Sequence, residues 1–206
     1  LFEDIRNAVF ETARPDDYDA VVIINLCVPT ASGVALDRLP RQIEGVRIIG
    51  IDVPGFGVPT HAEAKDVLAG VEAAVSKYSW IDSNRLGIEG SSYGGQLTNW
   101  IITQTDRFKA AVPAAGIANL VSFNYMAYYH DYLAVEFGSF PHEDGLMDLL
   151  WERSPIRYVH KVRTPVMFVH GENDNDVPIA EAEQFYIALR DAGVKTIMVR
   201  YPREGH

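Results

Sequence analysis

The segment at residues 90–95 reads Gly-Ser-Ser-Tyr-Gly-Gly and combines residue types that could form a covalent catalyst. Its centre is Ser92, which has a glycine two positions away on each side and follows an apolar run. This pattern is typical of a nucleophile elbow, a sharp turn from a strand into a helix. Such a turn holds the hydroxyl clear of its surroundings and crowds any side chain beside it, which favours glycine. The alternative is a glycine-rich helix N-terminus that holds an anion.

A serine nucleophile also needs a general base and a carboxylate that orients the base, and both residue types follow the elbow. A predicted strand at residues 165–170 leads into an acidic loop with Asp174 and Asp176, and a predicted strand at residues 196–200 leads to His206. Strand ends are where α/β sheets place chemistry, and the order serine, aspartate, histidine is that of α/β-hydrolases. The residue types do not by themselves separate the two aspartates.

The chain from about residue 66 to residue 206 resembles the serine peptidases of the prolyl oligopeptidase family, especially their acylaminoacyl peptidase and dipeptidyl peptidase branches. The resemblance rests on six segments in the family's order, at residues 80–87, 90–95, 105–112, 151–155, 170–174 and 201–206. It implies that Ser92 is the nucleophile, that Asp174 rather than Asp176 orients the base, and that His206 is the base.

The resemblance is incomplete at the site for the negatively charged oxygen of the reaction, the oxyanion hole. Peptidases of this family place a His-Gly-Gly type loop before the elbow unit, and this sequence has the unrelated segment 25–33 there. The backbone N–H of Tyr93 is expected to be one donor, whereas a second could come only from the backbone of residues 27–32. Because the oxyanion hole is commonly the largest electrostatic contribution to catalysis, the activity itself stays open.

The N-terminal third resembles a different family. Residues 24–33 and 50–65 are similar to the Y subunit of chlorophyllide reductase, a nitrogenase-like protein. The two resemblances meet in a predicted helix at residues 64–71, so we interpret the chain as a chimera, engineered or otherwise, of two α/β proteins. Residues 52–57 also resemble a loop of many α/β-hydrolases, which leaves a natural hydrolase N-terminus open. In the reductase family, the cysteine that corresponds to Cys27 is expected to be an iron–sulfur ligand. Such a cluster normally takes four thiolates and this chain has one cysteine, so we interpret Cys27 as a buried free thiol.

Alternating strand and helix patterns predict an α/β fold, with a mostly parallel sheet and helices on both faces, that is hydrolase-like over the C-terminal two thirds. Continuous apolar runs at residues 20–26 and 46–51 are typical of buried strands. A capping box opens a helix that is predicted to run from Thr60 to about Lys77, and an amphipathic helix is predicted at residues 2–10.

The segment at residues 114–159 is rich in aromatic side chains and is predicted to form helical excursions above the sheet. Its aromatic side chains could line an apolar substrate pocket or belong to the core. A helix is then predicted from Pro178 to about Arg190, and Gly193 is expected to end it as the C-terminal cap.

At 206 residues, with 48% hydrophobic residues, the chain has the length of a single α/β domain. Its net charge of −10, without a basic run, argues against a nucleic-acid partner, and no apolar run is long enough for a membrane helix. A single cysteine fits a reducing compartment, and a cytoplasmic location is expected. No metal site is expected among the histidines, because their spacing is not that of metal ligands, and His170 is interpreted as structural.

The predicted function is therefore the hydrolysis of a peptide or ester substrate by Ser92, Asp174 and His206, without a cofactor. Two alternatives remain at this stage: a chimeric scaffold with little or no activity, and a fragment of a tetrapyrrole reductase. The sequence leaves open the substrate, the choice between exopeptidase and endopeptidase action, and the oligomeric state.

Overall fold

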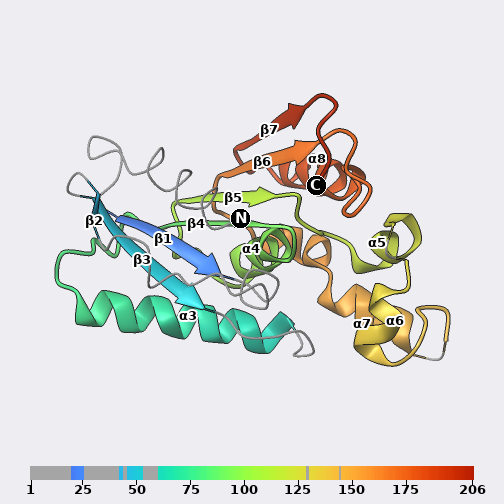
Figure 1. The fold of residues 1–206 in the computed structure, drawn as a ribbon, viewed down its shortest axis with the longest axis horizontal. Helices are drawn as coiled ribbons and strands as arrows, with labels where there is room; N and C mark the ends of the chain where they lie inside the picture. The colour runs from blue at the N-terminus through green and yellow to red at the C-terminus, as the bar shows by residue number, and fades with distance from the viewer. Residues whose placement is uncertain (1–19, 26–41, 44–45, 53–59, 129, 144) are drawn as a thin grey trace. The chain divides into compact units, whose positions relative to one another are not determined.

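The computed structural model describes residues 20–25, 42–43, 46–52, 60–128, 130–143 and 145–206. The chain divides into two compact units, Leu1–Ser83 and Asn84–His206 (Figure 1). The predicted helix at residues 2–10 and the thiol of Cys27 lie outside the described residues, as does most of the predicted loop at residues 52–57.

The described residues of the first unit form a small sheet and a long helix after it. Strand β1 (Ala20–Asn25) pairs in parallel with β3 (Val46–Asp52), and the short β2 (Gln42–Ile43) pairs with β3 in the antiparallel sense. Helix α3 (Thr60–Lys77) has an acidic first turn and a basic last turn, which suits the helix dipole. The predicted strands at residues 20–26 and 46–51 and the predicted helix from Thr60 to about Lys77 are present.

The second unit is built on a parallel sheet of four strands in the order β4-β5-β6-β7. The strands are β4 (Gly87–Ser91), β5 (Ala110–Ala114), β6 (Val166–Gly171) and β7 (Thr196–Tyr201). Because all four run in the same direction, their carboxyl ends meet at one edge of the sheet, which is where ligands and catalytic groups collect in α/β proteins. The predicted, mostly parallel α/β architecture is confirmed.

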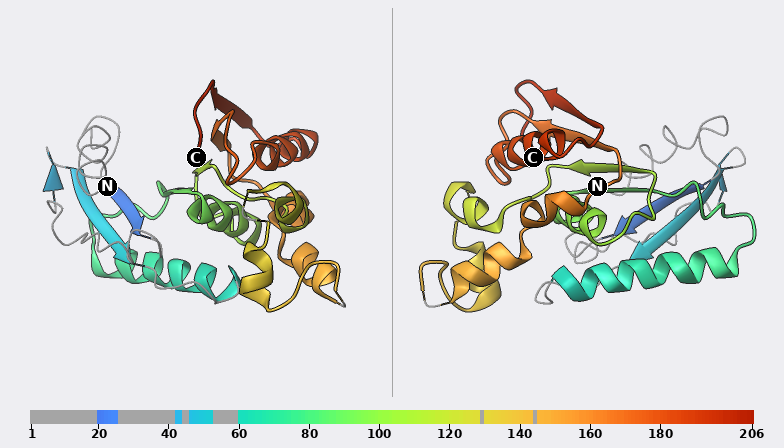
Figure 2. Two further views of the ribbon diagram at one scale, coloured as in Figure 1. Left: turned by 45° about the vertical axis from the view of Figure 1, so that its right-hand side comes forward. Right: turned by 180° about the vertical axis from the view of Figure 1, so that it is seen from behind.

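Helices pack against this sheet and fix its strands. Helix α4 (Tyr93–Gln104) packs against β4 and β5, and α8 (Ala180–Asp191) packs against β6 and β7 (Figure 1, Figure 2). A 3-10 helix, η2 (Pro155–Lys161), contacts both helices. Gly193 ends α8 as predicted: its φ of 78° places it in the left-handed region that favours glycine, one residue beyond the C-cap.

The chain between β5 and β6 forms the predicted helical excursion, with α5 (Leu120–Met126), α6 (Tyr132–Phe137) and α7 (Leu146–Arg153). Its buried side chains form one apolar cluster with the loop after β6, and its members are Ile117, Leu120, Phe123, Ala127, Leu133, Leu146, Leu150 and Val177. The core interpretation holds for Phe123, which is buried, whereas Tyr125 and Tyr128 are exposed. The interpretation that aromatic side chains line a substrate pocket stays a prediction.

None of the helices in the described part of the chain has the length and apolar character that crossing a bilayer requires. The described residues also contain no group of three or more histidine, cysteine or acidic side chains placed to hold a metal ion.

Candidate active site

Ser92 lies at the sharp turn between β4 and α4. Its backbone has φ 56° and ψ −121°, a conformation that costs a non-glycine residue about 1–3 kcal/mol and is maintained only by the surrounding structure. Its N–H donates to the carbonyl oxygen of Ala114 at 2.9 Å, and its own carbonyl oxygen accepts from the N–H of Gln96 at 3.0 Å. A Cβ atom on Gly90 would overlap the backbone of Gly94, so the turn requires glycine there. The strand, turn and helix that the motif predicts are all present.

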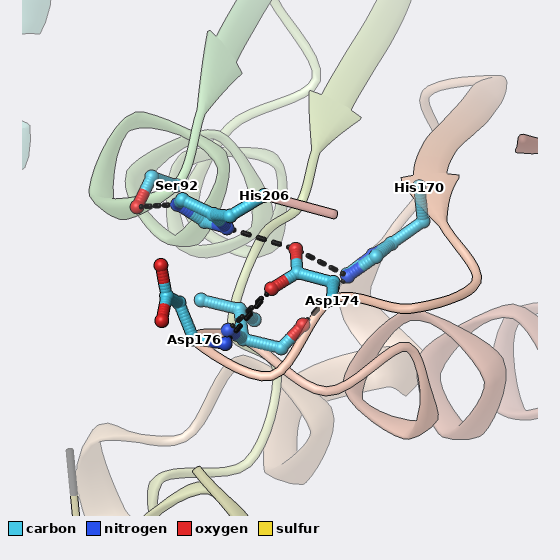
Figure 3. A network of polar contacts seen from close by, with 6 residues as sticks. Ser92, His170, Asp174, Asp176 and His206 are labelled. Carbon is cyan, nitrogen blue, oxygen red and sulfur yellow. Dashed lines mark hydrogen bonds and ion pairs between the residues drawn. The ribbon is translucent and has the colours of Figure 1, made fainter. Parts of the chain in front are cut away.

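The side chains of Ser92, Asp174 and His206 lie together at the carboxyl ends of β4, β6 and β7 (Figure 3). The Nε2 atom of His206 is 2.7 Å from Oγ of Ser92, and its Nδ1 atom is 2.8 Å from Oδ2 of Asp174. An ionised carboxylate can only accept, so Nδ1 carries the hydrogen and Nε2 of the neutral imidazole is left to accept from the serine hydroxyl.

The carboxylate in contact with His206 is that of Asp174, and its side chain is fully buried. Its Oδ1 atom accepts the backbone N–H of Asp176 at 3.0 Å and that of Val177 at 2.8 Å. These bonds hold Oδ1 on the loop and leave Oδ2 facing the imidazole. Asp176, the alternative from the sequence, takes part in this arrangement through its backbone N–H.

His170, the last but one residue of β6, lies behind the Asp174 carboxylate on the side away from Ser92 (Figure 3). Its Nε2 atom is 2.8 Å from the carbonyl oxygen of Val177 and 3.3 Å from Oδ2 of Asp174. Burial lowers the pKa of His170, and the nearby Asp174 carboxylate opposes this shift only in part. The sequence interpretation of His170 as structural missed this contact; the only signal for it is the spacing of four residues between the histidine and the aspartate.

The loop that carries His206 is tied to the loop that carries Asp174. The N–H of Asn173 donates to the carbonyl oxygen of Glu204 at 2.9 Å. A Cβ atom on Gly171 would overlap the backbone of Glu204, so the close approach of the two loops depends on glycine at this position. The position of His206 therefore depends on contacts between its loop and the residues at and just after the end of β6.

Tyr93, the residue expected to donate to the oxyanion, directly follows Ser92 and is the first residue of α4. The N-terminus of a helix favours negative charge, which suits an oxyanion beside Ser92. The segment expected to supply a second donor, residues 27–32, lies outside the described residues.

The sequence model of the prolyl oligopeptidase family matches residues 59–206, well over half of the chain. The chain belongs to the prolyl oligopeptidase family. It is 43% identical over 144 residues to the uncharacterized peptidase YuxL of Bacillus subtilis, and 31% identical over 153 residues to the acylamino-acid-releasing enzyme of Rattus norvegicus. These matches cover 68% and 71% of the chain but 21% of each relative, so the chain spans about a fifth of the length of these curated relatives.

Solved structures of the prolyl oligopeptidase family share this fold. The acylaminoacyl peptidase of Pyrococcus horikoshii superposes with a TM-score of 0.74 and 21% identity, over 92% of this chain and 33% of that chain. A puromycin-hydrolyzing peptidase of Mycobacterium tuberculosis superposes with a TM-score of 0.70 and 26% identity, over 92% of this chain and 31% of that chain. The prediction of an α/β-hydrolase-like fold is confirmed.

A segment of the chain is also similar to a second kind of protein. The chain is 72% identical over 79 residues to the chlorophyllide reductase 52.5 kDa chain of Cereibacter sphaeroides, a match that covers 38% of this chain and 15% of that protein. The reductase match covers 38% of the chain and the YuxL match covers 68%. Together these shares exceed the length of the chain, so the two matched segments overlap. The predicted resemblance to the reductase is confirmed, and the overlap is consistent with a chimera. A junction at residues 64–71 stays a prediction.

Proposed function

We propose that the chain carries the catalytic site of a serine hydrolase that cleaves peptide or ester bonds, with Ser92, Asp174 and His206 as its triad. The observation that carries the proposal is the imidazole of His206, which bridges the hydroxyl of Ser92 and the buried carboxylate of Asp174 at 2.7 and 2.8 Å. Membership of a peptidase family supports the same chemistry. The family also favours a peptide as the substrate.

In the proposed reaction, the Oγ atom of Ser92 forms a bond to the carbonyl carbon of the substrate while its proton passes to Nε2 of His206. The buried Asp174 carboxylate accepts from Nδ1 and stabilises the imidazolium that results. His206 then gives the proton to the leaving amine or alkoxide, which departs and leaves an acyl group on Ser92. In the second half of the cycle, a water molecule gives a proton to the same imidazole and its oxygen bonds to the acyl carbon. The bond from that carbon to Oγ of Ser92 then breaks, Oγ takes the proton back from His206, and the carboxylic acid leaves.

The oxyanion that forms in each half-reaction needs hydrogen-bond donors beside Ser92. We assign one of them to the backbone N–H of Tyr93, at the positive end of α4. One such donor contributes about 10²- to 10³-fold to the rate in well-formed sites. The backbone of residues 27–32 stays the predicted source of the second.

The test is labelling with a fluorophosphonate, whose phosphorus is attacked by an activated serine with loss of fluoride. We expect the chain to be labelled on Ser92, the Ser92→Ala variant to lose the label, and the Ser91→Ala variant to keep it. Ser91 is a matched control because it is the neighbouring exposed serine at the end of β4. Equal labelling of the chain and of Ser92→Ala, or no labelling of either, would overturn the proposal in favour of a scaffold without activity.

A further inference from the structure

His170 is a buried imidazole in contact with the candidate site, and the reaction proposed above makes no use of it. It is 2% exposed, and its ring lies against the loop at residues 174–177. We infer that His170 is a positioning residue: its neutral ring donates the Nε2 hydrogen to Val177 and Asp174 and so holds the Asp174 carboxylate in place. The inference rests on the proposed function of Ser92, Asp174 and His206.

The contacts of the ring determine which nitrogen carries the hydrogen. Nε2 lies 2.8 Å from the carbonyl oxygen of Val177 and 3.3 Å from Oδ2 of Asp174, and both of these atoms are acceptors. Nε2 must therefore be the donor, with its main bond to Val177 and a longer contact to Asp174. Nδ1 is buried and has no hydrogen-bond partner among the described residues, so a hydrogen on it would be a buried, unsatisfied donor there.

The same arrangement keeps the ring neutral. A second proton would have to sit on Nδ1, and burial lowers the pKa of His170. Among the described residues, two titratable groups act on the ring: the carboxylate of Asp174, which favours the charged form, and the imidazole of His206, which opposes it. A neutral ring donates a hydrogen bond to Asp174 without cancelling the negative charge that His206 needs.

The contacts of His170 complete the orientation of the carboxylate. Oδ1 of Asp174 is held by the backbone N–H groups of Asp176 and Val177, and Oδ2 faces both His170 and His206. The bond from His170 to Val177 also ties β6 to a residue of the apolar cluster, three positions after the aspartate. Loss of the Nε2 donor would leave both the loop and Oδ2 less constrained.

Two substitutions of similar size separate the hydrogen bond from simple packing. His170→Gln can place an amide N–H near the position of Nε2, whereas His170→Met fills similar space without a donor. We expect the fluorophosphonate labelling rate of His170→Met to fall about tenfold, and that of His170→Gln to stay within about threefold of the unchanged chain. The acid limb of the labelling rate should move to higher pH in His170→Met, because Oδ2 then bears more charge and holds the protonated form of His206 more strongly.

A purely structural role would lower the urea midpoint without moving the pH profile, so equal profiles for His170→Met and His170→Gln would overturn the inference. A second measurement does not depend on activity: the ¹⁵N resonances of the His170 ring at neutral pH. We expect a protonated Nε2 and a bare Nδ1, also in Ser92→Ala. A hydrogen on Nδ1 would overturn the inference, whereas absent labelling with the expected tautomer would overturn only the proposed function.

Discussion

The Nε2 atom of His206 lies 2.7 Å from Oγ of Ser92 although 114 positions separate the two residues in the sequence. Ser92 follows β4 and His206 follows β7, which are the two outer strands of the four-stranded sheet. Neighbouring strands are about 4.8 Å apart, so three spacings place β4 and β7 about 14 Å from each other. The short loop after β7 must therefore extend across the end of β6 towards the serine, and its path depends on its contacts with β6 and with the loop that follows β6.

Gly171 is the point at which this loop crosses β6, and we expect Gly171→Ala to lower the activity sharply. The added methyl group would overlap the backbone of Glu204, two residues before His206. A displacement of about 1 Å at a catalytic group can cost about 10²-fold in rate. The measurement is the fluorophosphonate labelling rate of the folded variant.

Gly193→Ala is the matched control for this prediction. Gly193 has a φ of 78° and open space around its Cα atom, and it lies at the end of α8 rather than in either active-site loop. The substitution should cost about 1–2 kcal/mol of unfolding free energy through backbone strain, with the labelling rate unchanged. Equal losses of labelling in the two variants would show that Gly171 acts through overall stability alone.

Asp174→Asn should lower the labelling rate by about 10³- to 10⁴-fold, because an amide no longer stabilises the imidazolium and does not fix the hydrogen on Nδ1 of His206. Asp176→Asn, two residues away on the same loop, should change the rate by less than about threefold, because its contact with Asp174 is made by its backbone N–H. A large loss in Asp176→Asn with a small one in Asp174→Asn would reverse the assignment of the two acids.

The features that the sequence predicts well are those in which local backbone geometry restricts the residue type. Ser92 between glycines and Gly193 at a helix end are such cases, since each conformation excludes most other residues. The strands β1, β3 and β6 are also accessible from the sequence, because each is a short run rich in apolar and β-branched residues. These signals are contained within a few consecutive residues.

The features that the sequence does not predict depend on contacts between distant segments or on the conformation of one loop. The residue types do not separate Asp174 from Asp176, and only the family resemblance favours Asp174, because the difference lies in the backbone N–H groups of the loop that donate to its Oδ1. His170 has an apolar strand before it, which gives no indication of the carboxylate that its ring meets. Glu181 has the sequence character of an exposed acid in the first turn of a helix, yet it is completely buried.

Glu181 joins α8 to the segment that follows β5, and its removal should destabilise the second unit. Its Oε2 atom accepts the backbone N–H groups of Ala118 at 3.0 Å and Asn119 at 2.8 Å. Its Oε1 atom accepts from Oγ of Ser122 at 2.5 Å and Nε2 of Gln184 at 3.1 Å. Glu181→Ala would leave these donors without their acceptor, and we expect a loss of about 2–4 kcal/mol in the unfolding free energy measured with urea. A loss below about 1 kcal/mol would contradict this account.

The pH dependence of stability should also report on Glu181. Burial raises the pKa of its carboxyl group, and the four donors oppose the shift without cancelling it. The folded protein therefore binds this proton more tightly than the unfolded chain. The resulting stability is fully present below the unfolded pKa of about 4.3 and is lost as the pH rises through the raised folded pKa.

Glu181→Gln removes this titration and keeps one acceptor oxygen. We expect the stability of the unchanged chain, measured relative to Glu181→Gln by urea unfolding, to be greater at about pH 4.5 than at about pH 7.5. All other titrating groups, including the buried His170 with its lowered pKa, are common to both proteins, so their contributions cancel in the comparison. A difference between the two proteins that is the same at both pH values would mean that Glu181 has no raised pKa in the folded state.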